Sequence, residues 1–178
     1  FGSQYTQLIA RRVRELNVYC EIQPFHHSIT LNSDIRGIIL SGSPSSVYAP
    51  EAPSIDLDAI LGKVPVLGIC YGAQLISYKY GGRVENEGTR EYGRAHLQAL
   101  AASPLLTGLS AESEVWMSHG DTITQLPQGY ELVARTETVT NAAFQNTALR
   151  AYAIQFHPEV THSKEGLSLL RNFLYTIC

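Results

Sequence analysis

Features that mark several specialised protein classes are scarce in this sequence. Its three cysteines, Cys20, Cys70 and Cys178, are odd in number and widely spaced, which predicts neither a disulfide framework nor a zinc knuckle. We find no signal peptide, lipidation motif or apolar run of transmembrane length, so we expect a cytoplasmic protein without a membrane partner. The formal charge is only −3 and the basic residues are scattered, so no nucleic-acid partner is expected.

The composition that remains is that of an ordinary soluble protein, with 44% hydrophobic and 16% charged residues. A chain of 178 residues fits one domain, which should bury roughly two thirds of the surface that its unfolded form exposes. Residues 1–4 look like a strand-to-helix turn with no strand before it, and Cys178 ends the chain without a polar tail. We therefore expect the chain to be a piece of a longer polypeptide.

Hydrophobic periodicity predicts alternating helices and strands in the first half of the chain. Apolar residues recur at helical spacing over 5–16, whereas short β-branched runs bounded by glycine indicate buried strands. The expected order is helix 5–16, strand 18–22, strand 37–40, helix 55–61, strand 64–69 and helix 73–80. This alternation is typical of an α/β fold with a doubly wound, mostly parallel sheet flanked by helices.

The second half of the chain has a different pattern. Short strand-like segments separated by turn residues predict additional antiparallel strands. They are expected at 97–100, 114–117, 132–136 and 142–145, followed by a strand over 151–156 and a closing helix over 166–175.

Residues 68–72, Gly-Ile-Cys-Tyr-Gly, follow a buried strand and begin a helix. Small flanking residues let the chain turn sharply and hold Cys70 clear of the sheet, where the unpaired amides of the helix N-terminus favour the reactive thiolate. The N–H of Tyr71 is placed to stabilise the oxyanion of a tetrahedral intermediate. The alternative is that Cys70 is a small buried apolar residue, which is the usual fate of a free cysteine.

A second motif, Gln-Phe-His-Pro-Glu at 155–159, lies at the end of another expected strand. Because side chains alternate along a strand, Ala153, Gln155 and His157 share one face, and His157 would emerge at the carboxyl end, where open α/β sheets place their sites. Glu159 follows closely enough to reach the far ring nitrogen of His157, as the third member of a triad does. The alternative is a capped strand end with a surface ion pair.

These two motifs, in this order, resemble those of the class I glutamine amidotransferases, a family with a flavodoxin-like fold. Its members hydrolyse glutamine through a cysteinyl thioester and pass ammonia to a synthetase site. Within the family, the whole chain is similar to the amidotransferase domain of GMP synthetases. The stretches that carry this similarity are 1–12, 68–74, 90–93 (Arg-Glu-Tyr-Gly), 115–121 (with Ser-His-Gly-Asp) and 156–163 (with Val-Thr-His-Ser).

The resemblance implies a second domain. GMP synthetases of this kind carry a following ATP-pyrophosphatase domain, which adenylylates XMP with ATP and magnesium and lets ammonia displace AMP to give GMP. We therefore expect residues 1–178 to be the glutamine amidotransferase domain, with no cofactor or metal of its own, and the synthetase domain beyond 178. A homodimer of the full-length protein is left open. Residues 90–93 either line the docking face or form a plain β-turn.

Carried over residue by residue, the resemblance makes Cys70 the nucleophile, His157 the general base and then acid, and Glu159 its orienting partner. The residues expected to bind glutamine are Gly42, Gln74, Ser118, His119, Gly120 and Asp121. Gln74 has the alternative of a solvated helix residue. For His119 the alternatives are a structural role or that of a rival base.

One departure from the family concerns the oxyanion hole, whose second donor would be the N–H of Ser43. Where the family usually has Gly-Gly-Pro, this chain has Gly-Ser-Pro at 42–44, and serine reaches some backbone angles only at a cost. Either Ser43 adopts an ordinary conformation and donates anyway, which we favour, or the hole forms only when glutamine or the synthetase domain arrives.

Other functions remain compatible with the sequence. One is an amidotransferase that serves an anthranilate, carbamoyl phosphate or CTP synthetase. Another is a cysteine peptidase or hydrolase built on a similar turn, and a third is a non-catalytic interaction domain.

Overall fold

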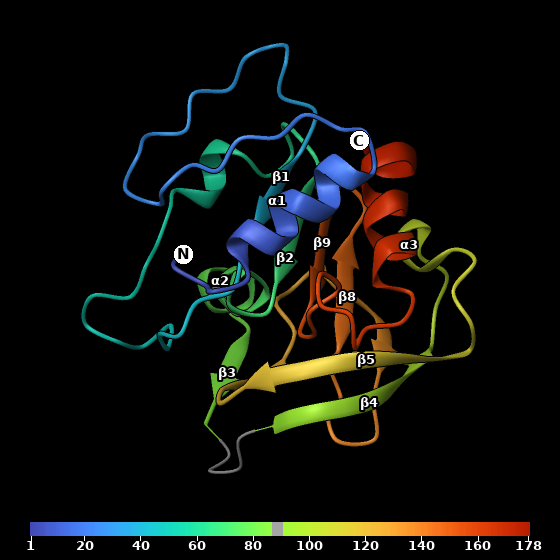
Figure 1. The fold of residues 1–178 in the computed structure, drawn as a ribbon. Coiled ribbons are helices and arrows are strands. Elements are labelled where there is room, and N and C mark those ends of the chain that lie inside the picture. Colours follow the sequence, from blue (N-terminus) through green and yellow to red (C-terminus); the bar gives the residue numbers. More distant parts are fainter. Residues whose placement is uncertain (87–90) are drawn as a thin grey trace.

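The computed structural model describes residues 1–86 and 91–178, and in them a seven-stranded sheet forms the centre of the molecule (Figure 1). Its strand order is β1-β2-β9-β8-β7-β4-β5. The parallel part consists of β1 (Ile38–Leu40), β2 (Val66–Ile69) and β9 (Ala151–Ile154). Ile69 is paired with Ile154, so the carboxyl ends of β2 and β9 lie side by side.

The rest of this sheet is antiparallel. Its strands are β8 (Ala143–Asn146), β7 (Glu131–Arg135), β4 (Glu91–Ala99) and β5 (Glu112–His119). Among the described residues, two of the six pairings in the sheet are parallel and four are antiparallel, so the antiparallel share is larger than the sequence indicated. A small separate sheet pairs β3 (Arg83–Glu85) with β6 (Thr122–Gln125).

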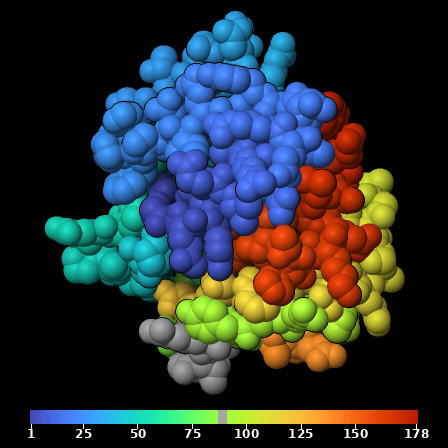
Figure 2. Space-filling model, in the orientation of Figure 1, coloured from blue at the N-terminus to red at the C-terminus, as the bar shows by residue number. Residues whose placement is uncertain are grey.

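Helices cover both faces of the parallel strands. They are α1 (Thr6–Glu15), α2 (Tyr71–Lys79) and α3 (Gly166–Arg171), the last continued by a π-helical stretch (Asn172–Ile177). Helices α1 and α3 contact each other on one face, and Figure 1 shows them side by side in front of the strands. In Figure 2 the surfaces of the N-terminal and C-terminal segments adjoin on this face.

Side chains of β2 alternate between two hydrophobic clusters. Leu67 and Ile69 belong to the cluster that contains the buried residues of α1 and α3, whereas Val66 belongs to the cluster with Leu75 and Ile76 of α2. All three β2 residues are fully buried, as expected for a parallel strand covered on both faces. The doubly wound α/β fold class is therefore confirmed.

Two elements expected from the sequence are different in the structure. Residues 18–22 do not form a strand: Val18 and Cys20 are partly buried against the cluster of α1, and the guanidinium of Arg14 donates to the carbonyl of Cys20 at 3.2 Å. Their apolar character serves packing instead of sheet pairing. The helix expected over 55–61 is a single 3₁₀ turn (Leu57–Ala59). No helix among the described residues combines the length and apolar character needed to cross a bilayer.

Candidate active site

Cys70 lies at the tight turn between β2 and α2. Its backbone has φ 52° and ψ −104°, an outlier of the kind that costs of order 1–3 kcal/mol. Two glycines make the turn sterically possible. A Cβ on Gly68 would lie 2.8 Å from the α2 backbone, and one on Gly72 would lie 2.4 Å from the carbonyl oxygen of Leu40. The amide of Cys70 donates to the carbonyl of Ile154 at 2.8 Å, which ties the turn to the end of β9.

His157 is positioned by β5 as well as by β9. Strand β9 ends at Ile154, two residues earlier than expected, and the amide of His157 then donates to the carbonyl of Trp116 on β5 at 3.0 Å. The buried hydroxyl of Ser163 reinforces this link. It donates to the carbonyl of His157 at 2.5 Å and accepts from the amide of Trp116 at 3.0 Å. The backbone that carries the imidazole is thus fixed from two sides.

Glu159 supports the imidazole from behind. Its Oε1 lies 2.7 Å from Nδ1 of His157, and the relative exposures of the two residues are 0% and 3%. Arg12 on α1 donates from Nε to the carbonyl of Glu159 at 3.0 Å, and the ring of Tyr5 packs edge-on against the imidazole. Because both partners are buried, the alternative of a surface ion pair is wrong.

Both neighbours of the imidazole favour its protonated form. Burial by itself lowers the pKa of His157, but hydrogen bonds to Cys70 and Glu159, together with the negative charge of both side chains, outweigh burial and raise the pKa. An imidazolium beside the sulfur stabilises a thiolate, which is the nucleophilic form of cysteine. The arrangement can therefore activate the thiol and later deliver a proton to a leaving group.

Two further groups contact the sulfur of Cys70. The carbonyl oxygen of Ser118, in β5, lies 3.7 Å from Sγ, and the side-chain Nε2 of Gln155 lies 3.8 Å from it. Ser118 was expected at the site, whereas Gln155 was not expected to touch the nucleophile. The signal in the sequence was a single amide side chain at the end of an otherwise apolar strand.

The residues expected to bind glutamine are partly assembled. Gln74 is 3% exposed, and its Nε2 donates to the carbonyl of Asp121 at 2.7 Å, so the alternative of a solvated helix residue is wrong. Gly120 and Asp121 form the turn between β5 and β6. Asn86 donates to the carboxylate of Asp121 at 3.0 Å. The turn therefore lies against the first part of α2, next to Cys70.

His119 points into the protein interior. It is 5% exposed and lies opposite Glu91 of β4, with Nε2 3.3 Å from the carboxylate, although neither ring nitrogen makes a hydrogen bond with the described residues. Burial, and to a smaller extent the positive charge of His157, lower the pKa of His119 to about 4, against the opposing charge of Asp121. A neutral, buried imidazole of this kind is a poor candidate for a rival base.

The two backbone donors expected for the oxyanion hole are Tyr71, at the start of a helix, and Ser43, in a loop. Tyr71 is the first residue of α2, where helix N–H groups have no intrahelical partner. Ser43 is not among the described residues with positive φ, and its hydroxyl accepts from the amide of Ser45 at 3.2 Å. The role of the Ser43 N–H as a donor stays a prediction. Gly42 lies against the imidazole of His157, because a Cβ at Gly42 would be 3.4 Å from Cε1 of that ring.

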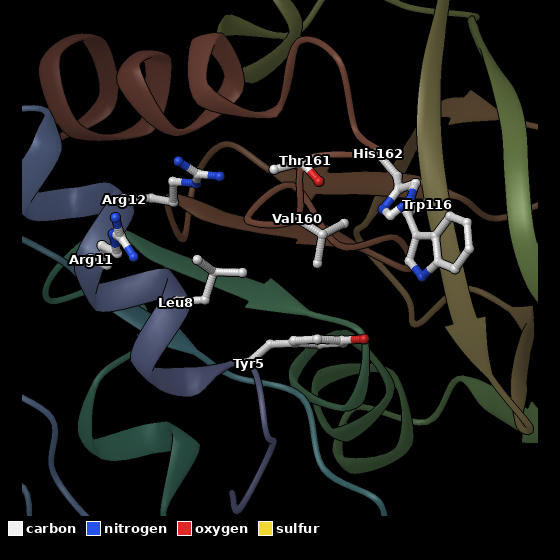
Figure 3. A pocket seen from close by; sticks show the side chains of 8 residues that line it. All are labelled: Tyr5, Leu8, Arg11, Arg12, Trp116, Val160, Thr161 and His162. Atoms are coloured by element: carbon white, nitrogen blue, oxygen red, sulfur yellow. The ribbon is translucent and has the colours of Figure 1, made fainter.

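A cavity of about 470 Å³ lies beside the triad (Figure 3). It is bounded by α1, by β5 and by the segment that follows Glu159, and its lining includes Tyr5 and Arg12, which contact the triad from behind. The indole of Trp116 and the ring of His162 pack together in its wall, 4.5 Å apart between ring centroids.

The expected Arg-Glu-Tyr-Gly motif begins at Arg90, which lies outside the described residues. Residues 91–93 form the first part of β4 and pair with β5, so this stretch is a strand instead of a β-turn, and Tyr92 is exposed. Within the described residues, no group of three or more histidine, cysteine, aspartate or glutamate side chains is arranged to hold a metal ion.

A strained cysteine turn and a buried histidine–glutamate pair, at the carboxyl edge of a doubly wound sheet, define a class of enzymes that use a cysteine nucleophile for acyl transfer. Comparison with known families narrows this class. The model of the family described as glutamine amidotransferase class-I matches residues 1–177. The chain belongs to the class I glutamine amidotransferase family.

Several curated relatives match the chain along its whole length. A GMP synthase (glutamine-hydrolyzing) from Phocaeicola vulgatus is 55% identical over 179 residues, which is 100% of this chain and 35% of the relative. A protein of the same name from Porphyromonas gingivalis is 56% identical over 175 residues, again 35% of its length. The chain therefore spans about a third of the length of these relatives.

Solved structures share the fold. A candidate GMP synthase subunit from Thermoplasma acidophilum aligns with a TM-score of 0.83 and 33% identity over 99% of this chain and 89% of its own. A glutamine amidotransferase from Thermotoga maritima aligns with a TM-score of 0.81 at 22% identity, which shows the fold alone. The first of these chains is scarcely longer than the present one.

Proposed function

We propose that this domain hydrolyses glutamine to glutamate and ammonia through a thioester on Cys70, and that the ammonia serves the synthesis of GMP. The observation that carries the hydrolytic part is the buried contact between His157, Glu159 and the sulfur of Cys70. The end of β5 and the turn that follows it, residues 118–121, lie next to the sulfur and offer backbone groups for an amino-acid substrate.

In the first half-reaction the thiolate of Cys70 attacks the carbon of the glutamine side-chain amide and forms a C–S bond. The imidazolium of His157 gives its proton to the amide nitrogen, the C–N bond breaks, and ammonia leaves. In the second half-reaction neutral His157 takes a proton from water, whose oxygen attacks the thioester. The C–S bond then breaks, which releases glutamate and restores the thiolate and the imidazolium. Glu159 holds the imidazole in place throughout.

The negative oxygen of each tetrahedral intermediate needs hydrogen-bond donors. The N–H groups of Tyr71 and Ser43 take this role in the proposal, which is supported for Tyr71 by its place as the first residue of α2. The α-amino and α-carboxylate groups of glutamine would be held by Gln74 and by the backbone at 118–121. Gln74 also holds the turn itself through the carbonyl of Asp121.

The synthetase half of the proposal rests on the relatives. They are named GMP synthases and are almost three times as long as the chain, which supports an ATP-pyrophosphatase domain in the same polypeptide. In the proposal that domain binds ATP and magnesium, adenylylates XMP and receives the ammonia. A cytoplasmic location and a homodimer of the full-length protein stay predictions from the sequence.

Glutaminase activity tests the hydrolytic part. Cys70→Ala should end the release of glutamate from glutamine, because no other group can form the thioester, whereas the control Cys20→Ala should retain the activity. A glutamine-mimicking alkylator should label Cys70 in the unmodified protein. Glutaminase activity that survives in Cys70→Ala would remove the central claim.

A second assay tests the acceptor. The full-length protein should convert XMP to GMP with ATP and glutamine, and Cys70→Ala should do so only when ammonia is supplied in place of glutamine. Glutamine hydrolysis without any amination of XMP would assign the domain to another synthetase. Hydrolysis of peptides or esters, with indifference to glutamine, would instead indicate a different cysteine hydrolase.

A further inference from the structure

Gln155 is placed beside the nucleophile by the pairing of two strands. Ile69 and Ile154 are paired across β2 and β9, and the amide of Cys70 donates to the carbonyl of Ile154 at 2.8 Å. The next residue along the chain after β9 is Gln155, whose own amide donates to the carbonyl of Ala142 at 2.8 Å. The side chain therefore starts from a backbone fixed on both sides, and its Nε2 reaches to 3.8 Å from Sγ of Cys70.

The side chain of Gln155 is costly for the fold. The residue is 0% exposed, and its Oε1 has no hydrogen-bond partner among the described residues. An unpaired buried acceptor is destabilising, and an apolar side chain of similar shape would avoid that loss. A buried amide whose other end contacts the reacting sulfur therefore suggests a role in chemistry instead of in packing.

The contacts of the sulfur differ in which protonation state they favour. The carbonyl oxygen of Ser118, at 3.7 Å, can accept a hydrogen bond from the neutral thiol and repels the thiolate. The N–H of Gln155 can only donate, so its contact strengthens when the sulfur becomes negative. When the Cys70 thiol loses its proton, its favourable contact therefore changes from the carbonyl of Ser118 to the side-chain amide of Gln155, and the sulfur does not need to move.

We propose that Gln155 is a catalytic residue of this site, whose side-chain amide donates a hydrogen bond to the sulfur of Cys70 and stabilises the thiolate. The inference rests on the proposed glutamine hydrolysis and deepens it. His157 removes the proton, and Gln155 holds the resulting charge before the attack and again when the thioester breaks. The same contact limits the rotation of the sulfur.

Alkylation of Cys70 tests this role without glutamine. The rate at which iodoacetamide modifies Cys70, followed on the Cys70 peptide by mass spectrometry, rises with the thiolate fraction as pH rises. Gln155→Met keeps the size of the side chain and removes the donor. We expect the midpoint of its pH–rate profile to move up by about one unit, so that alkylation below the midpoint is about tenfold slower.

Gln145→Met is the matched control. Gln145 is also buried, at 2% exposure, and its Oε1 also lacks a partner within the described part of the chain, but its Nε2 donates to Ala102 and Glu131, away from Cys70. The control should keep the alkylation profile of the unmodified protein. Glutaminase kinetics should separate in the same way, with Gln155→Met lowering kcat about tenfold and leaving KM nearly unchanged.

An unchanged midpoint in folded Gln155→Met, or an equal shift in Gln145→Met, would overturn the proposal.

If Gln155→Met does not fold, the unmodified domain provides a second measurement. The glutamine residues of the protein are labelled with ¹⁵N at the side-chain amide and observed by NMR. The chemical shift of one side-chain amide, that of Gln155, should change with pH together with the ionisation of Cys70, and this change should disappear in Cys70→Ser. Absence of such a resonance would also overturn the proposal. Both measurements can fail while glutamine hydrolysis is intact, so the two hypotheses are separately testable.

Discussion

Replacing His119 with a residue that cannot bind a proton should make the protein more resistant to acid. In the folded state this imidazole is buried beside Glu91. Its pKa is lowered to about 4, mainly by burial and less by the positive charge of His157, while the charge of Asp121 acts in the opposite direction. In the unfolded chain the imidazole has its ordinary pKa of 6.5. Between these two values the unfolded state binds a proton that the folded state excludes, so acidification favours unfolding.

The size of the effect follows from the difference of about 2.5 units between the two pKa values of His119. The stability that depends on a neutral His119 is present above pH 6.5 and is lost as the pH falls towards 4. At 1.36 kcal/mol per unit, lowering the pH from 7.5 to 4.5 should cost about 2.5 kcal/mol through this residue alone. With a urea m-value of about 2 kcal/mol/M, this corresponds to about 1 M in the unfolding midpoint.

The free energy of unfolding in urea is measured at pH 7.5 and 4.5 for the unmodified protein and for His119→Gln. The loss on acidification in the unmodified protein minus the loss in the variant is the contribution of His119. Other titrating groups cancel, and any loss of packing in the variant is the same at both pH values. His96→Gln, at an exposed histidine of β4, is the control and should lose as much stability on acidification as the unmodified protein. Equal losses in His119→Gln and the unmodified protein would refute the argument that this imidazole is kept neutral by burial.

Three further substitutions have defined outcomes. Gly72→Ala should destabilise the domain by about 3 kcal/mol or more in urea unfolding, because its Cβ would lie 2.4 Å from the carbonyl oxygen of Leu40 in the backbone of β1. Glu159→Gln should reduce glutaminase activity by about 10²- to 10⁴-fold, less than Cys70→Ala, because the imidazole loses its charged partner but keeps a neighbour of similar shape. Ser163→Ala should lower the free energy of unfolding by about 2 kcal/mol and glutaminase kcat by about tenfold, because two backbone partners are left unpaired behind the imidazole.

Matched controls separate these explanations from general damage. Gly108→Ala introduces a Cβ into open space at φ +77°, so only backbone strain of about 1 kcal/mol is expected, and a loss as large as that of Gly72→Ala would contradict the steric argument. Ser168→Ala, at an exposed position of α3, should change neither stability nor kcat. A Glu159→Gln variant as inactive as Cys70→Ala would show that the carboxylate does more than orient the imidazole.

The sequence was sufficient to predict that Cys70, His157 and Glu159 lie together, because each sits in a local motif with its own physical signature. Cys70 is flanked by two glycines at the end of a buried strand, and His157 and Glu159 are separated by one proline. Gln155 was predicted to share a face with His157, but not to contact the sulfur. That contact depends on the register between β2 and β9, which no local pattern encodes.

Contacts between residues far apart in the chain also explain where the fold differs from the sequence-based prediction. Residues 18–22 have the apolar pattern of a strand, but partial burial of Val18 and Cys20 against the core satisfies that pattern without a neighbouring strand. The sheet was expected to be mostly parallel because the first half of the chain alternates strands and helices. The order in which β8, β7, β4 and β5 extend the sheet depends on contacts between residues far apart in the chain.

The antiparallel part of the sheet matters to the site because β5 contacts both Cys70 and His157. The carbonyl of Ser118 lies 3.7 Å from the sulfur of Cys70, while the amide of His157 donates to the carbonyl of Trp116 two residues earlier on the same strand. A displacement of β5 would therefore alter the position of His157 and the environment of the Cys70 sulfur together. The parallel strands β2 and β9 bring Cys70 and His157 to one edge of the sheet, and β5 contacts both residues there.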